Sequence, residues 1–188
     1  TVSGSASVVS EDGQKTALKK GDILKVGSVV EVDKDSYLDL AYDSQWNNIT
    51  RISADSKVKI RSIYPTDLFM DKGDILAKLH KLPAQSTFEI ETPPAVAAVR
   101  GSEYRTVYRD GVTDVYNLHT SNVEVYGKDP EGAMMREPVI LKQDEKTGID
   151  RLGEAPRVPE AVSEKEKNEN RSLGENLNRA AEVHEEKG

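Results

Sequence analysis

Two carboxylates spaced two positions apart are the closest approach to catalytic machinery in this sequence. Glu89 and Glu91 alternate within the stretch STFEIET, so an extended chain places both on one face. A carboxylate pair can serve as acid and base in glycoside hydrolysis. However, Phe88 and Ile90 alternate with them, which is typical of a strand with one buried and one solvated face. We therefore predict no catalytic residues and a chain that is not an enzyme, with a hydrolase as the least favoured of three interpretations.

Metal and cofactor chemistry finds even less support. Asp33, Asp35 and Asp39 in VDKDSYLDL resemble part of a calcium loop, but the glycine at its sixth position and the glutamate at its twelfth are missing. The chain has no cysteine, which removes thiolate zinc sites, disulfides and cysteine nucleophiles. We predict neither a metal site nor a cofactor.

An aromatic loop offers binding chemistry instead. In YDSQWNNIT, Tyr42 and the single tryptophan, Trp46, flank amide side chains that include Asn47. Exposed aromatic rings beside amides can stack on sugar rings and hydrogen-bond their hydroxyls. The competing interpretation is that Trp46 closes the core from a loop. These three residues are the predicted ligand contacts for the alternative function, a carbohydrate- or peptidoglycan-binding module, and leave a glycan as the alternative ligand.

Composition narrows the possible partners and compartment. The 188 residues carry a formal net charge of −7, which disfavours nucleic acid as a partner. Apolar runs are only a few residues long, far below the ~20 that a transmembrane helix needs, so we predict no transmembrane segment. The sequence begins at Thr1, directly in a strand-like pattern. We expect that a signal peptide was removed upstream of it.

The sequence separates into two zones. All ten aromatic residues lie between Tyr37 and Tyr126, so the material for a core is N-terminal. The last part is charged and poor in large apolar residues, which is typical of a solvated segment. We predict a β domain over residues 1–155 and a charged linker or tail over 156–188, helical where it is ordered and interrupted near Gly174.

The body of the chain alternates with a period of two. Short stretches such as SASVVS, SVVEVD, KVKIRSI and NVEVYG are separated by Asp-Gly and Gly-Asp turn signals. Strands at such close spacing predict an all-β fold, a solenoid-like or sandwich-like stack of short strands.

One pentapeptide occurs twice. KGDIL appears at residues 20–24 and again at 72–76. Glycine allows a backbone conformation that a β-carbon forbids, and aspartate can accept hydrogen bonds from the amides that follow. We interpret Gly21-Asp22 and Gly73-Asp74 as duplicated structural turns that end strands, not as metal ligands.

A change of parity marks the stretch TPPAVAAVRGSEYRT, residues 92–106. Before Arg100 the odd positions are apolar, and after Gly101 the even positions become the inward-looking ones. A one-residue bulge at Arg100-Gly101 within a single strand would produce this switch.

These pieces, in this order, resemble a FecR-type domain over roughly residues 1–155. The most specific element is the family's Thr-Pro-x-Ala-x-x-x-Val-Arg-Gly pattern, and the motif residues matched by this chain are Thr92, Pro93, Val99, Arg100 and Gly101, with Gly21, Asp22, Gly73 and Asp74 in the two turns. Ser102 and Tyr104 depart from the Thr and Phe that the family usually has.

The resemblance implies a bacterial domain in the periplasm or outside the cell, with an all-β fold. The name-giving members relay iron-siderophore signals across the inner membrane to a sigma factor, through a membrane helix and a cytoplasmic segment that this chain does not show. We therefore expect a non-catalytic domain for protein binding, scaffolding or signalling at the cell envelope, with another envelope or secreted protein as its partner.

Overall fold

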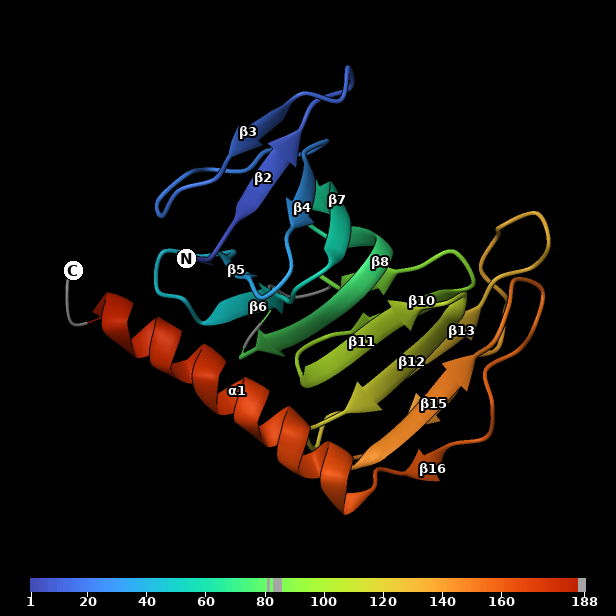
Figure 1. Cartoon of the computed structure of the whole chain (residues 1–188). Coiled ribbons are helices and arrows are strands. Elements are labelled where there is room, and N and C mark those ends of the chain that lie inside the picture. Colours follow the sequence, from blue (N-terminus) through green and yellow to red (C-terminus); the bar gives the residue numbers. More distant parts are fainter. Residues whose placement is uncertain (81, 83–85, 186–188) are drawn as a thin grey trace.

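The computed structural model describes residues 1–80, 82 and 86–185, and it is built almost entirely of strands. Within these residues sixteen strands join into one continuous sheet that folds over into two layers, and a single helix follows them (Figure 1). The predicted all-β, sandwich-like class is confirmed. We call the two layers sheet A and sheet B.

Both layers are antiparallel, except where β9 runs parallel to β8. Sheet A contains, in spatial order, β1 (Val2–Ser3), β5 (Tyr37–Ala41), β6 (Asn48–Ile52), the second half of β8 (Thr66–Leu79), β11 (Glu103–Arg109), β12 (Val112–Asn117), β15 (Glu145–Ile149) and β16 (Glu160–Ala161). Sheet B contains β3 (Lys15–Ala17), β2 (Ala6–Val9), β4 (Val29–Val32), β7 (Ser56–Ile63), the first half of β8, β9 (Phe88–Glu91), β10 (Ala95–Val99), β13 (Val123–Gly127) and β14 (Val139–Leu141).

Strand β8 belongs to both layers, and Gly73 marks the change. Residues up to Lys72 pair with β7 in sheet B, whereas Gly73 onward pairs with β11 in sheet A. Gly73 has a φ of 125°, and a β-carbon on it would lie 2.1 Å from Ser56 Oγ. The second KGDIL copy therefore lies inside a strand, and its interpretation as a strand-ending turn is wrong. The first copy does lie in a turn, where Asp22 accepts a hydrogen bond of 2.8 Å from the Lys19 amide.

The stretch around Arg100-Gly101 connects the two layers. Strand β10 ends at Val99 in sheet B and β11 begins at Glu103 in sheet A. The change of parity is confirmed, since Ala97 before the connection and Tyr104 after it are both buried. The predicted bulge within one strand is wrong, because the chain leaves one layer and enters the other here. Gly101, with a φ of 143°, permits that turn.

The hydrophobic core fills the space between the inward faces of the two sheets. Its largest fully buried side chains include Phe88, Tyr104 and Leu68, and both layers contribute to it. Strands such as β7 and β9 alternate buried and more exposed residues, as their period-two sequences predict. The side chains on the outer face of sheet A do not belong to this core.

The C-terminal helix α1 (Glu164–Glu185) crosses that outer face. It runs across β15, β12, β11, β8 and β6 in turn (Figure 1). The helix continues through Gly174, so the predicted interruption there is wrong. A β-carbon at Gly174 would lie 2.7 Å from Glu103 Oε1, which shows how closely the helix approaches the sheet. The boundary between residues 155 and 156 stays a prediction.

Candidate binding surface

The aromatic loop does not form one platform. Tyr42 packs edge-on against Phe88, with ring centroids 5.2 Å apart, and its hydroxyl lies 3.0 Å from Thr50 Oγ1. Tyr42 and Asn47 line one hollow of about 440 Å³, and Tyr42 and Trp46 line another of about 340 Å³. The structure thus separates Trp46 from Asn47, and their role as ligand contacts stays a prediction.

Trp46 lies beside a small apolar cluster between sheet A and helix α1. It packs against this cluster, in which Leu177 of the helix meets Ile49 of β6 and Leu76 of β8. This position agrees with the interpretation of Trp46 as a residue that closes a core from a loop. It also makes the only tryptophan of the chain a neighbour of the helix contact.

Under the helix, the outer face of sheet A carries buried ion pairs. On the adjacent strands β5 and β6, Arg51 donates Nε to Asp39 Oδ1 at 2.7 Å and Nη2 to Oδ2 at 2.8 Å. Both side chains are at most 5% exposed. The guanidinium also stacks over the Tyr37 ring, 3.9 Å from its centroid. This bidentate geometry holds the guanidinium in one orientation.

A second pair of the same kind lies at the centre of the face. Arg105 of β11 donates Nε to Asp74 Oδ1 at 2.9 Å and Nη2 to Oδ2 at 2.6 Å. Burial lowers the pKa of Arg105, but the hydrogen bonds and charge of Asp74, together with those of Glu169, outweigh burial and raise that pKa above its ordinary value. Asp74, first interpreted as a turn residue, is thus the anchor of a buried arginine.

Helix α1 binds this face through hydrogen bonds that the sheet donates. Arg105 Nη1 donates to Asn170 Oδ1 at 2.8 Å and lies 2.9 Å from Glu169 Oε1. Lys146 Nζ of β15 donates to Glu166 Oε1 at 2.7 Å. Two further donors reach the helix, the Tyr116 hydroxyl to Glu166 at 3.4 Å and Lys78 Nζ to Asn178 Oδ1. Three of these acceptors, Glu166, Asn170 and Asn178, are spaced four and eight residues apart, which places them on one side of the helix.

The apolar part of the contact is small. Leu177 is completely buried, and only Leu173 and Ala181 of the helix join it as partly buried apolar neighbours among the described residues. The contact thus consists of one leucine inserted between two strands and a row of polar contacts. We call this arrangement, with its donors Lys78, Arg105, Tyr116 and Lys146, the helix-binding face.

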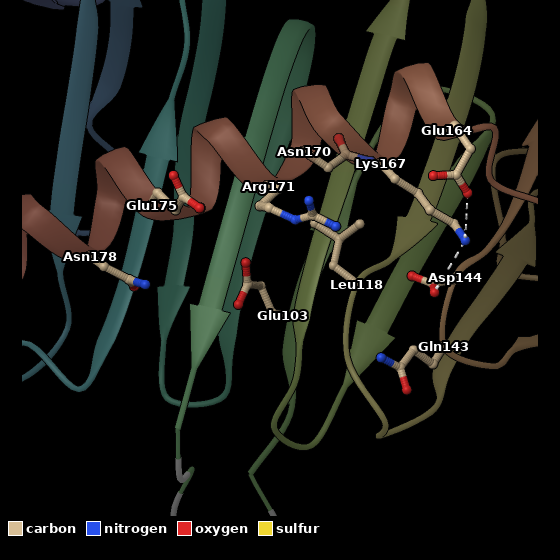
Figure 2. Close-up of a pocket in the computed structure, with 11 residues that line it drawn as sticks. Glu103, Leu118, Gln143, Asp144, Glu164, Lys167, Asn170, Arg171, Glu175 and Asn178 are labelled. Carbon is tan, nitrogen blue, oxygen red and sulfur yellow. Dashed lines mark ion pairs between the residues drawn. The ribbon is translucent and has the colours of Figure 1, made fainter.

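Two hollows flank the helix. Figure 2 shows the one of about 460 Å³, where Glu103 and Leu118 of the sheet side face Asn170, Arg171 and other polar residues of α1. Lys167 lies 3.5 Å from Asp144 Oδ2 and 3.4 Å from Glu164 Oε1 at its rim. A second hollow of about 630 Å³ opens on the other side, beside Arg51 and Arg179. Solvent therefore reaches the helix contact from both sides.

The remaining motif residues have structural positions. Thr92 is buried and its hydroxyl lies 2.8 Å from that of Thr113, which links the two layers. Pro93 precedes β10, whereas Val99 is the last residue of that strand and belongs to the core. Arg100 is exposed at the connection between layers, in a hollow of about 410 Å³ that Gly101 also lines. None of these residues lies on the helix-binding face.

The described residues contain neither a cluster of metal-ligating side chains nor a membrane-spanning helix. No group of three or more His, Asp or Glu side chains there is arranged to hold a metal ion. In the same part of the chain, no helix has the length and apolar character needed to cross a membrane.

Comparison with known proteins agrees with the fold. Two crystal structures, at 1.65 Å and 2.50 Å, of a protein from Parabacteroides distasonis described as a "putative anti-sigma factor" superpose with a TM-score of 0.56 at 14% sequence identity. The superposition covers 72% of this chain and 60% of theirs, so the chain spans less than two thirds of the proteins it resembles.

The sequence comparison identifies the family. No curated protein matches the chain. The FecR protein family matches residues 19–124, more than half of the sequence and including both KGDIL copies and the Val-Arg-Gly connection. FecR proteins are envelope signalling components and regulatory. The chain belongs to the FecR protein family.

Proposed function

We propose that this chain is a non-catalytic domain of envelope signalling that binds another envelope or secreted protein through the helix-binding face. Its place of action is the periplasm or the cell exterior. Membership of the FecR family and the likeness to an anti-sigma factor fold support a regulatory role. Neither identifies the surface that a partner contacts.

The observation that carries the proposal is the way α1 is held. Arg105 and Lys146, on two strands of one sheet, donate to side-chain oxygens of a helix, and Leu177 enters a small apolar site between Ile49 and Leu76. Docking of an amphipathic helix on a complementary groove is a recurrent mode of recognition between proteins. The same chemistry can accept a helix from another protein.

The test uses the chain's own helix as a defined probe. In the full chain, Leu177→Asp places a carboxylate in the apolar site and is expected to release α1. A fluorescently labelled peptide of the α1 sequence, residues 164–185, is then titrated against this variant, and binding is followed by fluorescence anisotropy. We expect saturable binding.

A matched pair of charge-removing variants locates the site. Adding Lys78→Gln and Lys146→Gln to Leu177→Asp removes two sheet donors and is expected to weaken peptide binding at least tenfold. Adding Lys57→Gln and Lys59→Gln instead, on the outer face of sheet B, is expected to leave the affinity unchanged. Equal binding by both sets of variants, or no binding to Leu177→Asp, would contradict the proposal.

A further inference from the structure

We infer that α1 is a releasable cover of the helix-binding face, and that the partner which displaces it presents an amphipathic helix with carboxylate and amide oxygens around a single leucine. This inference rests on the proposed function. It adds the regulation of the face and the kind of partner that the face fits.

The helix has little apolar material to hold it in place. Of its 22 residues, Leu177 is the only fully buried large apolar side chain among those whose side chains are described. Starting a helix is unfavourable, and ordering its residues costs conformational entropy. Most helical stability in proteins comes from packing of an apolar face, which is small here. Detachment therefore costs much less than unfolding of the core.

The polar contacts are also weaker than their number suggests. The Glu169 side chain is 53% exposed and Lys146 is 23% exposed, so solvent screens these pairs. Asn170 is buried, yet its Nδ2 has no hydrogen-bond partner among the described residues, which is unfavourable for the docked helix. Gly174 lies inside α1, where glycine is less favourable than alanine. Each feature lowers the free energy needed to release α1.

The face itself keeps its geometry when the helix leaves. Asp74 holds Arg105 and Asp39 holds Arg51, and in both pairs the two partners belong to sheet A. The guanidinium groups stay oriented without the helix, so the face is ready for another occupant. A preformed surface lowers the cost of binding.

The contacts with α1 define the chemistry of that occupant. Glu166 and Asn170 accept hydrogen bonds from the sheet, and Leu177 fills the apolar site, which places an acceptor, an acceptor and a leucine at positions i, i+4 and i+11 of one helix. The α1 segment has six glutamates against two lysines and two arginines. A partner helix of the same acidic character fits the donors of the face.

A tether makes the covering function testable in the full chain. Lys78 and Asn178 are in contact across the interface, and the chain contains no cysteine, so Lys78→Cys with Asn178→Cys provides a unique pair for a short bifunctional thiol cross-linker. The labelled peptide of residues 164–185 is titrated against four forms: wild type, Leu177→Asp, the cysteine pair before cross-linking, and the cross-linked pair.

We expect Leu177→Asp to bind the peptide at least tenfold more tightly than wild type, because α1 competes in the unmodified chain. The cross-linked pair should show no binding, and the same pair before cross-linking should bind at least as tightly as wild type. A peptide in which Glu166 and Glu169 are replaced by lysine should not bind Leu177→Asp.

The outcomes separate the two proposals. Absence of binding to Leu177→Asp would contradict the proposed function and with it this inference. Equal affinity of wild type and Leu177→Asp, or full binding by the cross-linked form, would contradict only the covering role of α1. Equal binding of the charge-reversed peptide would contradict the acidic character of the partner.

Discussion

At the scale of single residues, two glycines show how the same backbone freedom serves different purposes. Gly73 and Gly101 both have positive φ angles, 125° and 143°. A β-carbon on Gly73 would collide with the side chain and backbone of Ser56, whereas one on Gly101 would meet only the Leu79 carbonyl oxygen at 3.9 Å. A side chain would strain the backbone at both positions, but it would collide with a neighbouring residue only at position 73.

This contrast predicts different costs for the same substitution. Gly101→Ala should lower the free energy of unfolding by about 1–3 kcal/mol, the usual range for a strained backbone conformation. Gly73→Ala should cost more, because Ser56 must also move. Chemical denaturation of both variants measures the difference. Equal costs would show that crowding at Ser56 is not what restricts position 73.

The buried pair of Asp39 and Arg51 gives a second prediction at this scale. Arg51→Leu leaves the Asp39 carboxylate buried without its partner, which should cost about 3–5 kcal/mol of unfolding free energy. The double variant Asp39→Leu/Arg51→Leu removes both charges and should recover a large part of that loss. Urea denaturation provides both values. A double variant less stable than the single one would contradict this account of the pair.

At the scale of elements, strands and helix differ in how far the sequence predicts them. The period-two pattern of stretches such as KVKIRSI is local, so β7 could be predicted from it. The connection at Arg100-Gly101 could be predicted only as a change of parity, because a bulge and a passage between layers give the same local pattern. The choice between them depends on which strands pair, and that is decided by distant residues.

The helix-binding face is the part of the structure that the local sequence predicts least. Arg105 binds Asp74, 31 positions earlier, and Asn170, 65 positions later. Nothing in the local sequence of Arg105 distinguishes it from a solvated residue on the polar side of a strand. Leu177 likewise is one leucine in a charged tail. The tail composition predicted a helix, but not that it lies on a sheet.

At the scale of elements, the contact of Glu166 with sheet A predicts a pH-dependent contribution to stability. Desolvation raises the pKa of Glu166, but hydrogen bonds from Lys146 and Ser163 outweigh it and lower the pKa to about 2, from an ordinary value of 4.5. A depressed pKa in the folded state means that the stabilisation is complete above pH 4.5 and is lost as the pH falls toward 2.

Glu166→Gln should therefore lower Tm relative to wild type near pH 7, and the difference should shrink as the pH falls from 4.5 toward 2. Thermal unfolding of both proteins across this range measures it, with Glu164→Gln as a control at an exposed position of the same helix turn. A difference in Tm that stays constant down to pH 3 would contradict the role of the Lys146–Glu166 pair.

At the scale of the whole molecule, β8 joins the two sheets and α1 stands apart from their shared core. The strands of both layers contribute to one hydrophobic cluster, whereas the helix shares a separate small cluster with Ile49 and Leu76. We expect the sandwich to unfold as one cooperative unit and the helix to detach on its own. Trp46 packs against the cluster that contains Leu177, which makes this separation observable.

The same tryptophan tests the carbohydrate alternative. Added glycan fragments, including peptidoglycan fragments, should leave the Trp46 emission of the wild-type chain unchanged if the partner is a protein. A saturable shift in that emission would favour the alternative function through the Tyr42–Trp46 loop.

The most direct measurement is the Trp46 emission of Leu177→Asp during addition of the α1 peptide, which contains no aromatic residue of its own. We predict a red-shifted emission for the variant alone, because the cluster against which its tryptophan packs loses Leu177. We also predict a saturable return to the wild-type spectrum as the peptide fills the same site. An emission that does not respond to the peptide would contradict the claim that the outer face of sheet A binds helices.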